Sequence, residues 1–509
     1  MSAVNDVPPA SAARGSGRRW LDADRSTSWS VSSWVVATAV FVCATLILGG
    51  ASEGDATQSI YSAMLIAHGD FSCAYPPAAF SHFGGYPLTF TSPLYTLVSA
   101  IAGWALRIGG GLPFPPSSAL GVNCAHAMTL VGNWTNSGTI LVALLRVGYL
   151  SWLVLAAGIV ALMRASGKGR NRREAAVLMA IASSGPVVSC LAAYFHPEDL
   201  MAMGLVLMAM ASIVRERWWL AGVFVVLGVL TQLFVVLAAI PLLIVLPAQQ
   251  RLRFLNAAVV VVIVLVTPLA LVTSGRVWHA VLLGTSRAGS PHVVGAGGTV
   301  AFALGLHGPA LFLLSRIAPM VGAAVVAWSA WRRWGERLRE PVLLVALVGT
   351  CLALRVLFDV NTFNYYYMAP VVSVLLLDAL RGRFRGETFA LMWLVTLAYS
   401  PIPLNYMWRG TVVVPNVRAA LPYLVAVPLL VVLVISAYRH HVRWFLISSL
   451  VAVSVAFIRF PLSNSQYSPV IPSWCWQLLL VVPLVYWLSE PLRRANGRDQ
   501  VATGALDGG

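Results

Sequence analysis

The stretch WVVATAVFVCATLILGG, residues 34–50, is apolar almost throughout and is long enough to cross a membrane as one helix. Similar apolar runs recur along the chain as far as Trp487. Of the 509 residues, 59% are hydrophobic and 10% are charged, and the mean hydropathy is +0.79. Few soluble domains combine such values. The sequence therefore predicts an integral membrane protein built of helices.

Short arginine clusters separate the apolar runs, and the positive-inside rule places such clusters in the cytoplasm. They lie at 14–20, 167–173, 215–217, 249–253, 332–339, 381–385, 438–443 and 491–498. They also account for the net charge of +16, so nucleic acid is not an expected partner. The pattern predicts an all-α bundle of about 14 transmembrane helices in the plasma membrane, with both termini cytoplasmic.

The predicted spans are 34–50, 139–163, 174–193, 199–213, 218–230, 232–247, 254–273, 309–330, 341–357, 364–381, 388–402, 419–437, 443–458 and 475–488. The short runs 218–230 and 232–247 are either two spans or a broken hairpin that only dips into the membrane. They belong to one transmembrane domain, 31–491, between disordered cytoplasmic tails at 1–30 and 492–509.

Residues 51–138 are predicted to form a long first extracytoplasmic loop with interfacial or re-entrant helices. The run 92–108 looks like a span, but counting it as one would move the basic cluster 167–173 outside. Cys73 and Cys124 both fall in this loop and either form a disulfide or stay unpaired. No metal-binding Cys or His spacing occurs, so no cofactor is assigned, and a requirement for a divalent cation stays open.

Acidic residues away from arginine gather at the predicted outer ends of the spans. Asp55 opens the first outer loop, within SEGDATQSIYSAMLIAHGDFSCAYPP (52–77), and His196, Glu198 and Asp199 lie in the short second loop, YFHPEDLM. Ionisable residues at a lipid boundary favour a functional site. The alternative for the second loop is that Pro197 begins a helix whose dipole favours two acids in the first turn, although this does not explain His196.

These segments resemble the GT-C superfamily of polytopic glycosyltransferases, in particular bacterial mannosyl- and arabinosyltransferases. GDATQSIYSAMLIAHGDF, followed by YPP, is similar to the family's first outer loop, and Asp55 and Tyr61 match its acidic residue and helix. The stretch 215–247 resembles a helix hairpin with an LTK motif, in which Gln232 stands where many relatives have Lys, and NTFNYYYMAP resembles the segment that opens a late span.

The resemblance implies a glycosyltransferase that moves a monosaccharide from a polyprenyl-phosphate donor to a cell-envelope lipid or glycan at the outer membrane face. It also implies an inverting reaction with Asp55 as general base, together with Glu198 and Asp199 in the catalytic group. Candidate substrate-binding residues are His196, Tyr61, Arg276, Arg287, His292, Arg355 and Tyr366. For each arginine, a charge at a span end that extends toward the lipid headgroups is at least as good an explanation. Tyr365, Tyr366 and Tyr367 either stack on sugars or, the favoured interpretation, form an interfacial aromatic belt.

Two other functions fit a polytopic membrane protein. A transporter or lipid-carrier flippase is expected to contain internal repeats and ionisable residues near the bilayer midplane. The sequence contains no evident repeat, and apart from Arg146 its ionisable residues lie near span ends. A glycan ligase is expected to have a large late outer loop with paired arginines, whereas the late outer loops here, 403–418 and 459–474, are short.

Overall fold

The computed structural model describes residues 27–48, 63, 65–67, 69, 74, 82–83, 86–87, 92–108, 138–168, 171–192, 195–275, 277, 300–301, 304–359, 364–382, 388 and 473–494. These residues are helical almost throughout, which confirms the predicted all-α fold class. The strands β1 (His82–Phe83) and β2 (Tyr86–Pro87) add a small antiparallel pair.

The α-helices are α1 (Thr27–Leu48), α4 (Pro93–Ile108), α7 (Gly138–Ala165), α8 (Asn171–Ala182), α9 (Gly185–Ala192), α10 (Pro197–Val214), α11 (Trp218–Thr231), α12 (Val236–Val245), α13 (Ala248–Val272), α16 (Gly308–Phe312), α17 (Ala318–Trp334), α18 (Pro341–Phe358), α19 (Met368–Arg381) and α24 (Ser473–Arg494). Short 3₁₀ or π turns connect some of them: η3 (Leu233–Val235), η4 (Leu313–Ile317), η5 (Gly335–Arg339) and η6 (Asn364–Tyr367).

Among the described residues, five helical segments are long and apolar enough to cross a membrane, and a sixth span results if the bent pair α8 and α9 counts as one. The five are Gly148–Ala165, Pro197–Val214, Ala248–Val272, Gly308–Arg339 and Pro341–Phe358. The predicted span 174–193 is broken by a bend of 58° between α8 and α9. The predicted spans 388–402, 419–437 and 443–458 lie almost wholly outside the described residues, and the total of about 14 stays a prediction.

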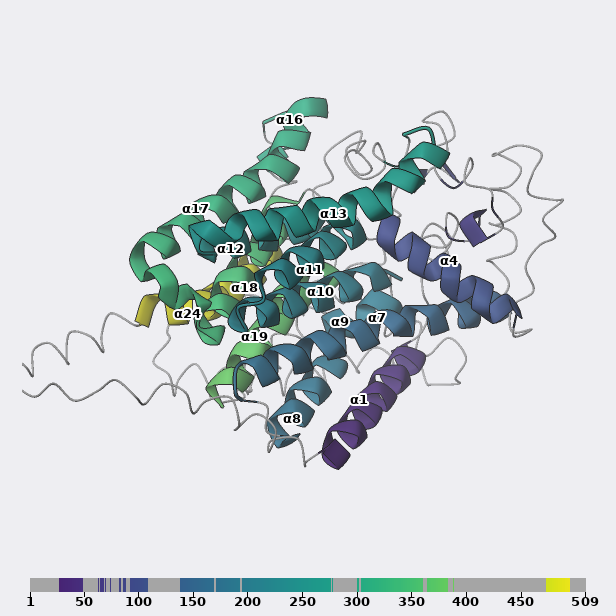
Figure 1. The fold of residues 1–509 in the computed structure, drawn as a ribbon, viewed down its shortest axis with the longest axis horizontal. Coiled ribbons are helices and arrows are strands. Elements are labelled where there is room, and N and C mark those ends of the chain that lie inside the picture. The colour runs from purple at the N-terminus through teal and green to yellow at the C-terminus, as the bar shows by residue number, and fades with distance from the viewer. Residues whose placement is uncertain are drawn as a thin grey trace, which may run out of the picture.

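The helices pack in two rows (Figure 1). One row consists of α7, α10, α11 and α13, each packed against the next. The other consists of α12, α17, α18, α19 and α24 around the central helix α18, and α10 contacts α18 between the rows. Helix α1 packs against α8 and α9, and also against α7, where Phe41 stacks on Trp152 with 4.5 Å between ring centroids. The site described below lies where the two rows meet.

Two glycines bring α7 and α10 into backbone contact. A Cβ atom added to Gly204 would lie 2.5 Å from the carbonyl oxygen of Val154, and one added to Gly158 would meet the carbonyl of Gly204. Small residues at such a crossing let two helix backbones approach closely. The two helices are therefore fixed against each other at this point.

The arginine clusters of the described residues gather at one end of the bundle, which we call the basic end. There Arg339 donates to the carbonyl oxygen of Val245 at 3.0 Å and lies over the ring of Trp218. Arg164 pairs with Glu174, and Arg381 pairs with Glu490. A shared basic end is the arrangement that the positive-inside rule requires of cytoplasmic loops.

Helices α11 and α12 form a hairpin. Trp218, at the start of α11, and Val245, at the end of α12, both contact Arg339 at the basic end. The chain therefore runs away from the basic end along α11, reverses at Gln232, and returns along α12. Both helices are shorter than a complete span, 14 and 10 residues, as expected for the broken-hairpin alternative.

Helix α4 covers the run 92–108, which has helical structure but is not among the candidate spans. It packs against α11 and α7, and Tyr95 joins Met201 and Leu205 of α10 in a small apolar cluster. That 92–108 does not cross the membrane stays a prediction. Within the first loop, Leu65 is fully buried in the main core, whereas Cys73 and Cys124 lie outside the described residues.

Candidate active site

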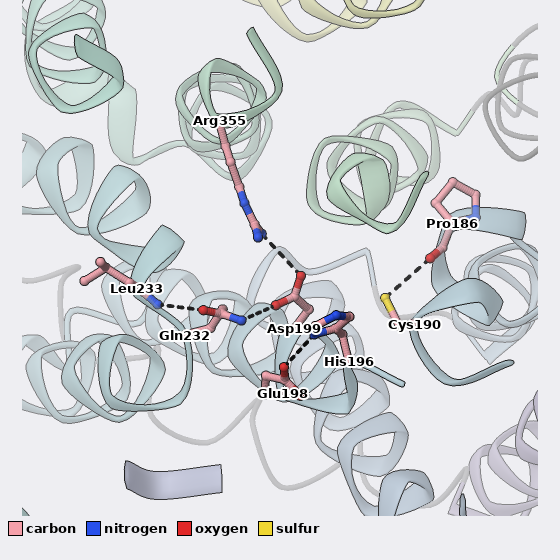
Figure 2. Close-up of polar contacts among 8 residues, drawn as sticks. All are labelled: Pro186, Cys190, His196, Glu198, Asp199, Gln232, Leu233 and Arg355. Atoms are coloured by element: carbon pink, nitrogen blue, oxygen red, sulfur yellow. Dashed lines mark hydrogen bonds and ion pairs between the residues drawn. The ribbon is translucent and has the colours of Figure 1, made fainter. Parts of the chain in front are cut away.

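Asp199 is the centre of a polar cluster at the end of the bundle opposite the basic end, which we call the site end. Arg355 of α18 donates from Nη1 to Oδ2 of Asp199 at 3.2 Å. Gln232, in the reversal between α11 and α12, donates from Nε2 to Oδ1 at 2.7 Å (Figure 2). Three helical segments that are far apart in sequence thus converge on one carboxylate.

The first turn of α10 places Asp199 there. Pro197 is the first helical residue, and Glu198 and Asp199 follow in the first turn, where the helix dipole favours acids. Phe195, just before the helix, is fully buried with φ of 50°, a left-handed conformation that non-glycine residues rarely adopt. The helix-start alternative is thus correct for the position of both acids. It does not account for the partners of Asp199, which are Gln232 just after α11 and Arg355 on α18.

Aromatic rings hold the guanidinium of Arg355. Its Cζ lies 3.9 Å from the ring centroid of Tyr366 and 4.7 Å from that of Phe234. Aromatic contacts of this kind are favourable for arginine and fix the plane of the guanidinium. Because Asp199 is bonded through Nη1, further N–H groups at the guanidinium edge remain available to an anion.

A second pair lies beside the first. Nδ1 of His196 and Oε1 of Glu198 are 2.8 Å apart, and the imidazole stacks on Tyr365 with 4.3 Å between ring centroids. Tyr365 meets Tyr366 edge to face at 4.8 Å, so the rings connect the His196 pair to Arg355. His196 therefore has a defined orientation, which turn formation alone would not require.

Tyr365 and Tyr367 are buried, and Tyr366 covers Arg355. The favoured interpretation of these tyrosines as an interfacial aromatic belt is therefore wrong, because belt residues face the lipid headgroups. Tyr366 is a neutral phenol at physiological pH, as tyrosine side chains ordinarily are.

Exposure separates the members of the cluster. The side chains of His196 and Arg355 are each 16% exposed, whereas those of Asp199 and Glu198 are 0% and 5% exposed. An incoming substrate can therefore touch His196 and Arg355 directly. Asp199 is fully buried with both carboxylate oxygens bonded, so its evident effect is to orient Arg355.

Residues 114–358 match the family model of glycosyltransferase family 87. This is a GT-C-type family of polytopic glycosyltransferases, so the match confirms the superfamily resemblance. The match covers slightly less than half of the chain and indicates a membrane glycosyltransferase. No curated protein matches the chain. The matched region contains His196, Glu198, Asp199, Gln232 and Arg355, so the site lies within the glycosyltransferase part of the chain.

The structure brings together five of the predicted site residues: His196, Glu198, Asp199, Arg355 and Tyr366. The remaining predicted residues, Asp55, Tyr61, Arg276, Arg287 and His292, lie outside the described residues. Among the described residues, no group of three or more His, Cys, Asp or Glu side chains is placed to hold a metal ion.

Two residues of the cluster were missed by the sequence analysis, Gln232 and Phe234. Gln232 was noted only as a departure from a lysine motif. An uncharged amide between two apolar runs carries little signal by itself. The informative signal is its position at the reversal of a hairpin, because that reversal reaches the same membrane face as the second outer loop.

Proposed function

We propose that this membrane glycosyltransferase transfers a monosaccharide from a polyprenyl-phosphate donor to a cell-envelope lipid or glycan acceptor at the outer face of the membrane. The observation that carries the proposal is the Arg355–Asp199 pair at the site end. A polyprenyl donor keeps its tail in lipid and presents its phosphate at the membrane boundary. An oriented and partly exposed guanidinium there is a suitable phosphate partner.

The proposed reaction is a single inverting displacement. Asp55 takes the proton from an acceptor hydroxyl, whose oxygen forms a bond to the anomeric carbon of the donor sugar. The bond from that carbon to the phosphate oxygen breaks, and the polyprenyl phosphate leaves with the electron pair. Arg355 stabilises the charge that develops on the phosphate. Arg276, Arg287 and His292 are further candidates for this role from the sequence.

In this scheme Asp199 is a positioning residue and Arg355 is a substrate-binding residue. Asp199 is fully buried and bonded through both oxygens, so it is poorly suited to accept a proton from a substrate. His196, held at Nδ1 by Glu198 and 16% exposed, can contact a substrate. Tyr366 holds the guanidinium and, as a neutral phenol, adds no charge near the phosphate.

The test uses the purified full-length chain in lipid nanodiscs with radiolabelled polyprenyl-phosphate mannose, arabinofuranose or glucose. The acceptor is a lipid extract from envelope membranes. We expect transfer of label from at least one polyprenyl donor and none from the matching nucleotide sugars. Transfer from a nucleotide sugar alone would overturn the donor assignment. Movement of a labelled lipid across the bilayer without glycosidic product would favour a flippase.

A further inference from the structure

Helix α4 carries a row of buried hydroxyl groups without hydrogen-bond partners. The side-chain oxygens of Ser92, Tyr95, Thr96 and Ser99 are all buried and unpartnered. Their spacing of three, four and seven residues places them on one face of the helix. Buried polar groups in proteins are nearly always hydrogen-bonded, and leaving one without a partner is destabilising. Four on one face therefore require an explanation.

That face is turned toward α10 and the candidate active site. Tyr95 packs against Met201 and Leu205 of α10. Glu198 lies three residues before Met201 and seven before Leu205, so it occupies the same face of α10, one turn nearer the site end. Tyr95 therefore brings the hydroxyl row of α4 next to the α10 face that carries Glu198, and its phenol is close enough to Glu198 to interact with the charge of that carboxylate.

Glu198 contributes its own unpartnered atom to this interface. Oε1 of Glu198 contacts His196, whereas Oε2 is buried and has no partner. Burial, above all, and then the charge of Glu198 raise the pKa of the Tyr95 phenol, and the nearby Ser99 hydroxyl lowers it, although the geometry between these two oxygens falls short of a hydrogen bond. Among the described residues, five of the nine buried unpartnered side-chain atoms belong to this one interface. Because these unpartnered atoms cluster at one interface, they are not explained by isolated imperfections of side-chain packing.

We propose that Ser92, Tyr95, Thr96, Ser99 and Glu198 form a subsite for the hydroxyl groups of a sugar ring. Hydroxyls can donate to and accept from sugar hydroxyls, and a carboxyl oxygen can accept from them. Such groups provide no positive charge for a phosphate, so the subsite suits an uncharged part of a substrate. That the bound sugar belongs to a substrate of the transfer reaction rests on the proposed function. The ability of these groups to bind a sugar does not.

The sugar ring bound at α4 could belong to the donor or to the acceptor, and the geometry favours the acceptor. Arg355, which we assign to the donor phosphate, reaches Asp199 from one side, whereas Glu198 and His196 lie on the other (Figure 2). The hydroxyl row adjoins Glu198 through Tyr95. A sugar at α4 would present its next hydroxyl toward the reacting centre between the two. The ring at α4 is therefore assigned to the acceptor glycan or glycolipid.

The binding test uses the full chain in nanodiscs, because maltoside detergents carry competing sugars. Saturation-transfer NMR is recorded with methyl α-mannopyranoside, methyl α-arabinofuranoside and methyl α-glucopyranoside. The variants are Tyr95→Phe, Ser99→Ala and the pair together. The control is Ser212→Ala on α10, whose hydroxyl is buried but already donates to the carbonyl of Met208.

We expect the wild type and Ser212→Ala to bind at least one glycoside, and the double variant to lose that signal. Loss of an unpartnered hydroxyl should leave the thermal midpoint of the free protein unchanged or raised, so misfolding cannot mimic the result. Failure of the wild type to bind any of the three glycosides would overturn the proposal. A signal that persists in the double variant would overturn it too, and would assign the hydroxyls to buried water or to packing alone.

Transfer kinetics then identify which substrate provides the ring. Tyr95→Phe together with Ser99→Ala should raise KM for the acceptor by about tenfold or more and leave KM for the donor unchanged. A rise in donor KM alone would assign the ring to the donor sugar. Unchanged values for both substrates would overturn the subsite. Glycoside binding without any transfer from polyprenyl donors would instead refute the proposed function and leave the subsite intact.

Discussion

Gln232 and Asp199, 33 positions apart in sequence, are joined by a hydrogen bond of 2.7 Å between Nε2 and Oδ1. The same amide accepts from the backbone N–H of Leu233 at 3.1 Å, so Gln232 both ends the α11–α12 reversal and holds the central carboxylate. One side chain thereby couples the local backbone geometry to the orientation of Arg355.

Replacing Gln232 by Leu should impair both stability and transfer. The change leaves Oδ1 of Asp199 buried without a partner, which should cost about 1–3 kcal/mol of unfolding free energy. Gln232→Lys restores a donor to Asp199 and should recover part of the transfer rate. Thermal unfolding and transfer rate are measured side by side, with Gln250→Leu as the control, because Oε1 of Gln250 is unpartnered. Wild-type activity in Gln232→Leu would contradict the positioning role.

Replacing one member of the Arg355–Asp199 pair should destabilise the protein more than replacing both members with apolar residues. Arg355→Met leaves a buried unpaired carboxylate and should destabilise the protein by about 3–5 kcal/mol. The double change Arg355→Met with Asp199→Leu should recover much of that stability but none of the transfer. Chemical unfolding and donor binding distinguish these effects.

A matched control for this pair exists at the basic end. Arg381 pairs with Glu490 at 3.0 Å, far from the proposed site, and the two side chains are more exposed, at 27% and 13%. Arg381→Met should weaken folding modestly and leave KM for the polyprenyl donor as in the wild type. If both arginine variants lose donor affinity equally, Arg355 has no specific role at the phosphate.

Asp55→Asn should abolish most of the transfer if Asp55 is the general base. The amide retains the shape of the carboxylate but cannot take the acceptor proton, so turnover should fall by about 100-fold or more while donor binding changes little. Asp70→Asn, in the same predicted outer loop, is the control. Turnover close to that of the wild type in purified, folded Asp55→Asn would reject the assignment.

Gly204→Ala should destabilise the bundle by about 1–3 kcal/mol or more, because the new Cβ would lie 2.5 Å from the carbonyl oxygen of Val154. Gly322→Ala is the matched control, since its Cβ would meet only the flexible Leu354 side chain at 3.1 Å. The thermal midpoints of the two variants are compared in nanodiscs. Equal midpoints would show that the α7–α10 contact tolerates separation.

The predicted topology is tested by single cysteines at positions 110 and 170 in a background without native cysteines. An impermeant maleimide applied to intact cells should label position 110 alone. The reason is that 110 falls in the predicted outer loop and 170 falls in a basic cluster. Labelling of both positions from outside would show that 92–108 crosses the membrane after all.

The sequence predicts the helices well because apolar runs and arginine clusters act locally. Helices α10, α11 and α18 begin and end within a few residues of the predicted spans 199–213, 218–230 and 341–357. The bend between α8 and α9 was not predicted. Its Ser-Ser-Gly-Pro break is short, and both sides are apolar, so hydropathy alone does not resolve it.

The candidate site was predictable in part for a different reason. Topology places His196, Asp199 and Arg355 at one membrane face, and ionisable residues there have to find partners. Which partner each residue takes depends on the lateral order of helices, and hydropathy contains no information on that order. Gln232 and the hydroxyl face of α4 were missed because neither carries a charge that would mark it in the sequence. Their positions beside α10 depend on the lateral order of the helices.

The hairpin of α11 and α12 also fixes how deep the chemistry lies. At a rise of 1.5 Å per residue, α11 reaches only about 20 Å from the basic end before the chain reverses at Gln232. Arg355, 14 residues beyond the start of α18, lies about 21 Å from that end. On the predicted topology the basic end lies at the cytoplasmic surface of a hydrocarbon layer roughly 30 Å thick, so the site would lie several ångströms beneath the far membrane surface. A lipid-borne donor can arrive sideways at that depth, whereas a water-soluble sugar nucleotide would have to descend into the bilayer.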